Sequence, residues 1–121
     1  MKTILVVDDN TDNRNIIAQM LKISGYRVVC ATDGLHALDL VASEPPDLIL
    51  MDMAMPVLDG WSATARLKSQ PDVADVPVIA VTGHVSQHEI TRAINVGCAD
   101  VLSKPIDYET MIHKVRTHLA A

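Results

Sequence analysis

The segment Ile4-Leu5-Val6-Val7-Asp8-Asp9 decides the fold class, because it joins a short apolar run directly to two carboxylates. A continuous apolar run, unlike an alternating one, is typical of a strand that is covered on both faces, as in a parallel sheet. Four further runs of strand length follow, at residues 28–31, 48–51, 78–81 and 99–102, and the last is interrupted by Asp100. The sequence therefore predicts five buried strands, with the fifth at an edge of the sheet.

Helical patterns separate these runs. The clearest is an apolar stripe near the C-terminus, at Tyr108, Met111, Ile112, Val115 and Leu119. An earlier helix is expected to carry Ile16, Ile17, Met20 and Leu21, with a cap at Asn10 or Thr11 and an end at Gly25. The other three helices are expected at 35–41, 58–67 and 90–96, each ending before a proline or glycine. Five alternations of strand and helix predict a doubly wound α/β fold with helices on both faces of a parallel sheet.

Composition limits the classes of function. The chain has 121 residues, of which 49% are apolar, as expected for a single globular domain over 1–121 with no output domain. Its net charge of −5 would be repelled by phosphate backbones, which argues against nucleic-acid partners. There is no apolar stretch long enough to span a bilayer and no signal-peptide pattern, so we expect a cytoplasmic protein without a membrane partner. Cys30 and Cys98 should lie at opposite edges of the sheet, too far apart to form a disulfide.

Polar side chains follow the predicted strands. They are Asp8 and Asp9 after the first, Asp52 after the third, Thr82 after the fourth, and Ser103 and Lys104 after the fifth. In open parallel sheets ligands bind beyond the carboxyl ends of the strands, so these side chains are expected to converge there. The sequence thus predicts one polar site at one edge of the sheet.

Three carboxylates at this edge would repel one another unless some are protonated or a cation is bound. Oxygen ligands without nearby His or Cys favour Mg²⁺. An ammonium group and a hydroxyl beside the cation would suit a phosphoryl group, and Asp52, alone at the end of a central strand, is the best candidate for a nucleophile. The pattern favours the formation of an aspartyl phosphate.

Three other interpretations stay open at this point. Asp8-Asp9-Asn10 by itself is also typical of a turn and a helix cap. A metal-dependent phosphohydrolase with an aspartyl intermediate would use similar groups, but it needs a cap that shields substrate from water. A flavin or nucleotide binder would need a glycine- or hydroxyl-rich loop after the first strand, where this chain carries negative charge.

The ordered set of motifs resembles a response-regulator receiver domain of the two-component or phosphorelay type, free-standing and similar to the chemotaxis receivers. The resemblance covers essentially the whole chain, through Asp8-Asp9, Asp52, Met55-Pro56-x-x-Asp59-Gly60, Thr82 and Lys104-Pro105. It implies a flavodoxin-like (βα)₅ sandwich with a parallel sheet of order 2-1-3-4-5. It also implies a protein that catalyses only its own phosphoryl transfer and autodephosphorylation, and is otherwise not an enzyme.

The resemblance implies a role for each site residue. Asp52 would accept the phosphoryl group, and Mg²⁺, for which Mn²⁺ is expected to substitute, would be bound by Asp9, Asp52 and the backbone carbonyl of Ala54. Asp8 would act on the ion through water. Phosphoryl oxygens would be held by Thr82 and Lys104, and the bond before Pro105 would be cis.

The resemblance also draws attention to positions where this chain departs from the family pattern and to positions that would tune the lifetime of the phosphoryl group. Val101 stands where the family usually has an aromatic residue, so a rotating aromatic switch is absent. Gly83 stands where alanine is commoner and should loosen the loop after the fourth strand. Ala54 and His84 occupy positions that flank the route of hydrolytic water, which would let them tune the lifetime of the phosphoryl group.

By the same resemblance, the phosphoryl donor would be a sensor histidine kinase or a histidine phosphotransfer protein. The donor is expected to dock near Asp52 and the first helix. Phosphorylation would then alter contacts with a downstream protein effector, although a role as a phosphate sink stays open.

Overall fold

The five predicted strands form one parallel sheet. They are β1 (Thr3–Val7), β2 (Arg27–Ala31), β3 (Leu48–Asp52), β4 (Val78–Thr82) and β5 (Asp100–Ser103), and their order in the sheet is β2-β1-β3-β4-β5. The computed structural model describes residues 1–120, so the last residue of the expected domain, Ala121, lies outside the described residues. The order and the parallel pairing confirm the predicted flavodoxin-like fold.

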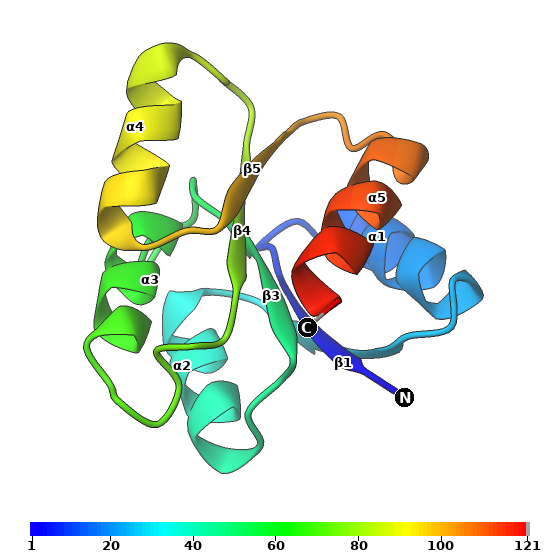
Figure 1. Ribbon diagram of the computed structural model, residues 1–121, viewed down its shortest axis with the longest axis horizontal. Helices are drawn as coiled ribbons and strands as arrows, with labels where there is room; N and C mark the ends of the chain where they lie inside the picture. The colour runs from blue at the N-terminus through cyan, green and yellow to red at the C-terminus, as the bar shows by residue number, and fades with distance from the viewer. Residues whose placement is uncertain (121) are drawn as a thin grey trace.

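Helices cover both faces of the sheet, as Figure 1 shows, with α1 and α5 together on one side and α2, α3 and α4 on the other. Their bounds are α1 Thr11–Ile23, α2 Gly34–Ser43, α3 Gly60–Lys68, α4 Gln87–Val96 and α5 Tyr108–Leu119. Within the described range 1–120, no helix is both long and apolar enough to cross a membrane.

Each face of the sheet buries its own aliphatic core. Ile4, Val6 and Leu50 pack with α1 and α5, whereas Leu5, Val7 and Ile49 pack with α2, α3 and α4. All residues of β3 and β4 are buried, because these strands are central and covered on both faces. Residues 48–51 of β3 therefore lie between two layers of packed apolar side chains, and Asp52 follows them at the carboxyl end of the strand.

The predicted strand bounds are confirmed to within one residue, and the helix starts differ more. The third helix begins at Gly60 instead of Leu58, because the Asp59 side chain accepts the Ser62 N–H and caps the helix there. The second and fourth helices begin one and three residues earlier than predicted, after capping by Asp33 and Ser86.

The ends of the sheet also behave as expected. Cys30 lies in the edge strand β2, Cys98 precedes the opposite edge strand β5, and both thiols are free.

On the face of the sheet covered by α2, α3 and α4, the Arg92 guanidinium of α4 stacks over the Trp61 ring of α3, 4.2 Å from its centroid. This contact ties α4 to the neighbouring helix.

An ionic cluster fastens α5 to the edge strand β5. Lys114 Nζ lies 2.8 Å from one Asp100 carboxylate oxygen and donates to the Val101 carbonyl, and His118 Nε2 lies 3.0 Å from the other Asp100 oxygen. Burial works to raise the pKa of Asp100, but hydrogen bonds from Lys114, His118 and the Val101 N–H outweigh it and hold this pKa below its usual value.

We expect Asp100→Asn to lower the free energy of unfolding by about 1 kcal/mol at neutral pH, because the lost pair is only partly buried. Since the folded-state pKa of Asp100 is lowered, its contribution is present above the unfolded-state pKa and is lost as pH falls through the folded-state pKa. Urea denaturation of both proteins at several pH values checks this. A stability gap that stays constant into strong acid would contradict it.

Candidate functional site

Asp8 and Asp9 lie in the turn that follows β1. Asp8 is buried, its backbone N–H continues the pairing with β2 through the Ala31 carbonyl, and its Oδ1 accepts the Asn10 N–H at 2.8 Å. Asn10 in turn caps α1 through the Asn13 N–H. The turn therefore holds the Asp8 carboxylate inside the sheet edge and leaves that of Asp9 exposed.

Asp52 ends the central strand β3 and is only 2% exposed. Its Oδ1 accepts the Ala54 N–H at 3.1 Å, and Lys104 Nζ lies 3.1 Å from its Oδ2. Burial raises the pKa of Asp52, and it outweighs the opposing effects of the Ala54 N–H and Lys104; the charge of Asp8 raises it further. The site thus contains a buried carboxylate whose ionised form is costly without a further cation.

The three aspartates converge as predicted. Asp8, Asp9 and Asp52 each offer a carboxylate oxygen, and these oxygens lie within 4.8 Å of one another. Asp52 Oδ2 is buried and accepts no hydrogen bond, although Lys104 Nζ is near enough to form an ion pair. A carboxylate oxygen that accepts no hydrogen bond, close to carboxylate oxygens of two other aspartates, suits the binding of a hard cation that prefers oxygen ligands.

Thr82 ends β4, the strand next to that of Asp52, and Lys104 directly follows β5. The backbone N–H of Lys104 donates to the Thr82 carbonyl at 2.9 Å, and Lys104 Nζ also lies 3.8 Å from an Asp8 oxygen. The Lys104–Pro105 peptide bond is cis. Lys104 therefore reaches across the sheet edge to both buried carboxylates.

The loop after β4 is closed on itself by Thr82. The Thr82 hydroxyl accepts the His84 N–H at 3.2 Å and lies 3.3 Å from the His84 carbonyl, to which it donates. The His84 side chain is exposed, and a side chain at Gly83 would meet nothing within 4 Å. Val101 is half-buried in β5, on the apolar side of the sheet that faces α4.

The loop after β3 contains a tight turn that the sequence motifs did not reveal. Val57 has a φ of 70°, and the Leu58 N–H donates to the Pro56 carbonyl two residues back at 2.9 Å. A positive φ is a strained conformation for a β-branched residue, and this three-residue turn is rare. The Val57 side chain is 75% exposed, so packing does not offset the strain.

Replacing Val57 with asparagine, which tolerates positive φ better, should raise the free energy of unfolding by about 1 kcal/mol. Chemical denaturation measures this directly. Val85→Asn is the matched control, because Val85 is also an exposed valine but has no positive φ. An equal effect of the two substitutions would contradict the assignment of strain to Val57.

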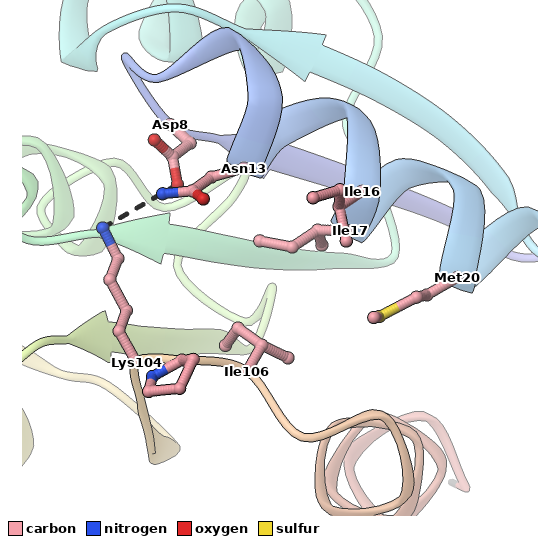
Figure 2. Close-up of a pocket in the computed structure, with 8 residues that line it drawn as sticks. Asp8, Asn13, Ile16, Ile17, Met20, Lys104 and Ile106 are labelled. Carbon is pink, nitrogen blue, oxygen red and sulfur yellow. Dashed lines mark ion pairs between the residues drawn. The ribbon is translucent and has the colours of Figure 1, made fainter.

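A groove leads away from the carboxylates along α1. It has a volume of about 400 Å³, with Asp8, Asn13 and Lys104 at its polar end and Ile16, Ile17, Met20, Pro105 and Ile106 along it. Figure 2 shows α1 carrying the isoleucines and Met20 on one side of it and Ile106 on the other. Ile16, expected in the apolar pattern of the first helix, is 53% exposed here, so α1 carries more apolar surface than the core uses.

Sequence reasoning also missed Arg14. Its guanidinium Nη1 donates to the backbone carbonyl of Asp8 at 2.9 Å. No motif marks this arginine, and the only available signal was its place one turn into α1, from which helical side chains point back toward the N-terminus.

Comparison with known proteins agrees with the geometry. Residues 4–116 match the family described as the response regulator receiver domain. The chain is 35% identical over 118 residues to the polar-differentiation response regulator DivK of Brucella anthropi, a match that covers 98% of this chain and 96% of that protein.

Two solved structures are similar over nearly their whole length. The receiver domain of the sensor histidine kinase PA1611 of Pseudomonas aeruginosa, solved with a magnesium ion coordinated in its active-site cleft, is 34% identical with a TM-score of 0.91, and the match covers 99% of this chain and 98% of that one. The chemotaxis protein CheY4 of Vibrio cholerae is 28% identical with a TM-score of 0.94, and the match covers 98% and 99%.

Proposed function

Because the chain belongs to the response-regulator receiver domain family, the phosphoacceptors of two-component signalling, we propose that Asp52 is the residue that accepts the phosphoryl group. The observation that carries this assignment is the buried Asp52 oxygen that accepts no hydrogen bond, between two further carboxylates and Lys104. Membership of this family also means that the protein is not a classical enzyme, so the phosphohydrolase interpretation is abandoned. We further propose that residues 1–121 act as one receiver domain.

The proposed step is an in-line displacement. One carboxylate oxygen of Asp52 attacks the phosphorus of a phosphohistidine, an O–P bond forms, and the N–P bond breaks with its electron pair moving to the imidazole, which takes up a proton. Lys104 offsets the charge that this adds to the pocket, since an aspartyl phosphate brings further negative charge next to Asp8.

The cation of this site is proposed to be Mg²⁺, with Mn²⁺ as a substitute. Asp9, Asp52 and the backbone carbonyl of Ala54 would bind it directly, and Asp8 through water. Support comes from the oxygen-only donor set and from the magnesium ion in the PA1611 receiver. Such an ion neutralises phosphoryl oxygens as charge develops.

Thr82 and Lys104 are proposed to hold the phosphoryl oxygens once Asp52 is modified. To donate to the phosphoryl group, the Thr82 hydroxyl must give up its bond to the His84 carbonyl, which frees the loop after β4. Because Val101 offers no aromatic ring to rotate, we propose that the response passes through this loop and α4. Ala54 and His84, both exposed at the rim, are proposed to set how readily water reaches the phosphoryl group.

The phosphoryl donor is proposed to dock over the groove along α1. A histidine kinase is the partner that the family implies. The groove has a polar end at Asp8 and Lys104 and an apolar flank formed by the exposed Ile16 and the partly buried Met20, which suits a helix that presents a phosphohistidine. A histidine phosphotransfer protein would fit the same surface, and a downstream protein effector, a phosphate sink role and the cytoplasmic location stay predictions.

Incubation with acetyl phosphate and Mg²⁺ tests the acceptor assignment by intact mass. Wild-type protein should gain one phosphoryl group, and Asp52→Asn should gain none, because the amide cannot attack phosphorus. Asp39→Asn, at an exposed position on α2, is the matched control and should gain one. Phosphorylation of the Asp52→Asn protein would disprove the assignment.

A further inference from the structure

Arg14 connects α1 to the peptide that joins Asp8 to Asp9. Its side chain runs back toward the start of the helix, Nη1 donates to the Asp8 carbonyl at 2.9 Å, and Nη2 lies 3.5 Å from Thr11 Oγ1. The guanidinium is partly buried in this position. A single side chain thus spans the β1–α1 turn.

The Asp8 carbonyl lies at a point where the backbone has left the sheet. β1 ends at Val7, and the Asp8 N–H makes the last backbone bond to β2, through the Ala31 carbonyl. Among residues 1–120, Arg14 is the only donor with a hydrogen bond to the Asp8 carbonyl. Because the peptide unit is planar, fixing this carbonyl also fixes the direction in which the backbone of Asp9 begins.

We infer that Arg14 is a positioning residue for the cation site: by holding the Asp8 carbonyl, it keeps the carboxylates of Asp8 and Asp9 within reach of Asp52. This inference rests on the proposed function, and it deepens it by assigning a residue that no motif marks. Arg14 acts through the backbone of the turn and touches neither the cation nor the phosphoryl group.

The sign of the effect on cation affinity separates positioning from simple charge. A positive guanidinium bound to the turn that carries Asp8 and Asp9 repels a cation, so its removal should strengthen Mg²⁺ binding if charge alone matters. If Arg14 positions the turn, its removal lets the Asp8–Asp9 peptide turn away and should weaken Mg²⁺ binding instead. The two explanations therefore predict opposite changes.

Calorimetric titration of the full chain with Mg²⁺ tests this. Arg14→Gln, which loses both charge and reach, should weaken Mg²⁺ binding about tenfold. Arg14→Lys keeps the charge and one donor at similar length, and it should restore most of the affinity. Arg116→Gln removes an equal charge from an exposed position on α5 and should leave the affinity unchanged.

Thermal melts in EDTA accompany the titrations and show whether each variant is folded. If Arg14→Gln does not fold, Arg14→Met, which keeps the apolar stem on the helix, takes its place in the titration. Mg²⁺ affinity equal to or higher than that of wild type in a folded Gln or Met variant overturns the inference. Failure of the proposed function looks different, because wild-type protein itself would then show no heat of Mg²⁺ binding.

Discussion

Gly60→Ala should lower the free energy of unfolding by about 3 kcal/mol. We expect no other glycine-to-alanine substitution in this chain to destabilise it more. A Cβ built on Gly60 would lie 2.3 Å from the Asp52 carbonyl oxygen and 2.7 Å from the Met53 Cα, and neither backbone atom can move aside without distorting the loop after β3. The Gly60 N–H also donates to the Met53 carbonyl. Chemical denaturation of the variant measures the loss.

The matched control is Gly83→Ala in the loop after β4. A Cβ there would meet nothing within 4 Å, and Gly83 does not have a positive φ. Alanine should therefore raise the free energy of unfolding by about 0.5 kcal/mol, because it reduces the conformational entropy of the unfolded chain. Equal destabilisation by both alanines would show that the contact at Gly60 is not the cause.

Mg²⁺ should stabilise the protein by about 2.7 kcal/mol when its concentration is about 100 times the dissociation constant, because it binds the folded state alone. Thermal or chemical denaturation with Mg²⁺ and with EDTA measures the difference. Asp9→Asn removes one proposed ligand and should abolish most of it, whereas Asp39→Asn, on the exposed face of α2, should retain it. Equal stabilisation of the two variants would refute binding at the three aspartates.

The stabilisation by Mg²⁺ should also depend on pH. Protons compete with the cation for Asp52, whose pKa burial raises in the folded protein. The effect of Mg²⁺ is therefore complete above this raised pKa and is lost as pH falls through it, beginning at a higher pH than for an ordinary carboxylate. Over the same range the metal-free protein gains stability from the protonation of Asp52, so the two stability curves should approach each other.

The fold class and the convergence of the three aspartates could be predicted because they depend on short-range patterns. Continuous apolar runs identify strands that are buried on both faces, and the residues that follow them must converge where parallel strands end. Asp8, Asp9 and Asp52 come together for this reason, without any long-range information. The family match adds the strand order, which residue patterns alone do not give.

What the sequence did not reveal depends on geometry beyond the pattern. The positive φ of Val57 goes against the preference of its residue type, so no propensity rule predicts it. The contact of Arg14 with the Asp8 carbonyl requires the exact path of the turn between β1 and α1. The exposure of Ile16 could not be predicted, because an apolar stripe on a helix does not show which of its residues pack against the core.

Because β3 is buried on both faces, its backbone should open to solvent much more slowly than the loop after β4. Every residue of this strand, Asp52 included, is buried, so its backbone amides should exchange with solvent only through global unfolding. The loop from Gly83 to Val85, exposed and flanked by the Thr82 hydroxyl, can open far more often without disturbing the core. Asp52 should therefore stay in place while this loop moves, and under the proposed function the segment after β4 would set the speed of the conformational response.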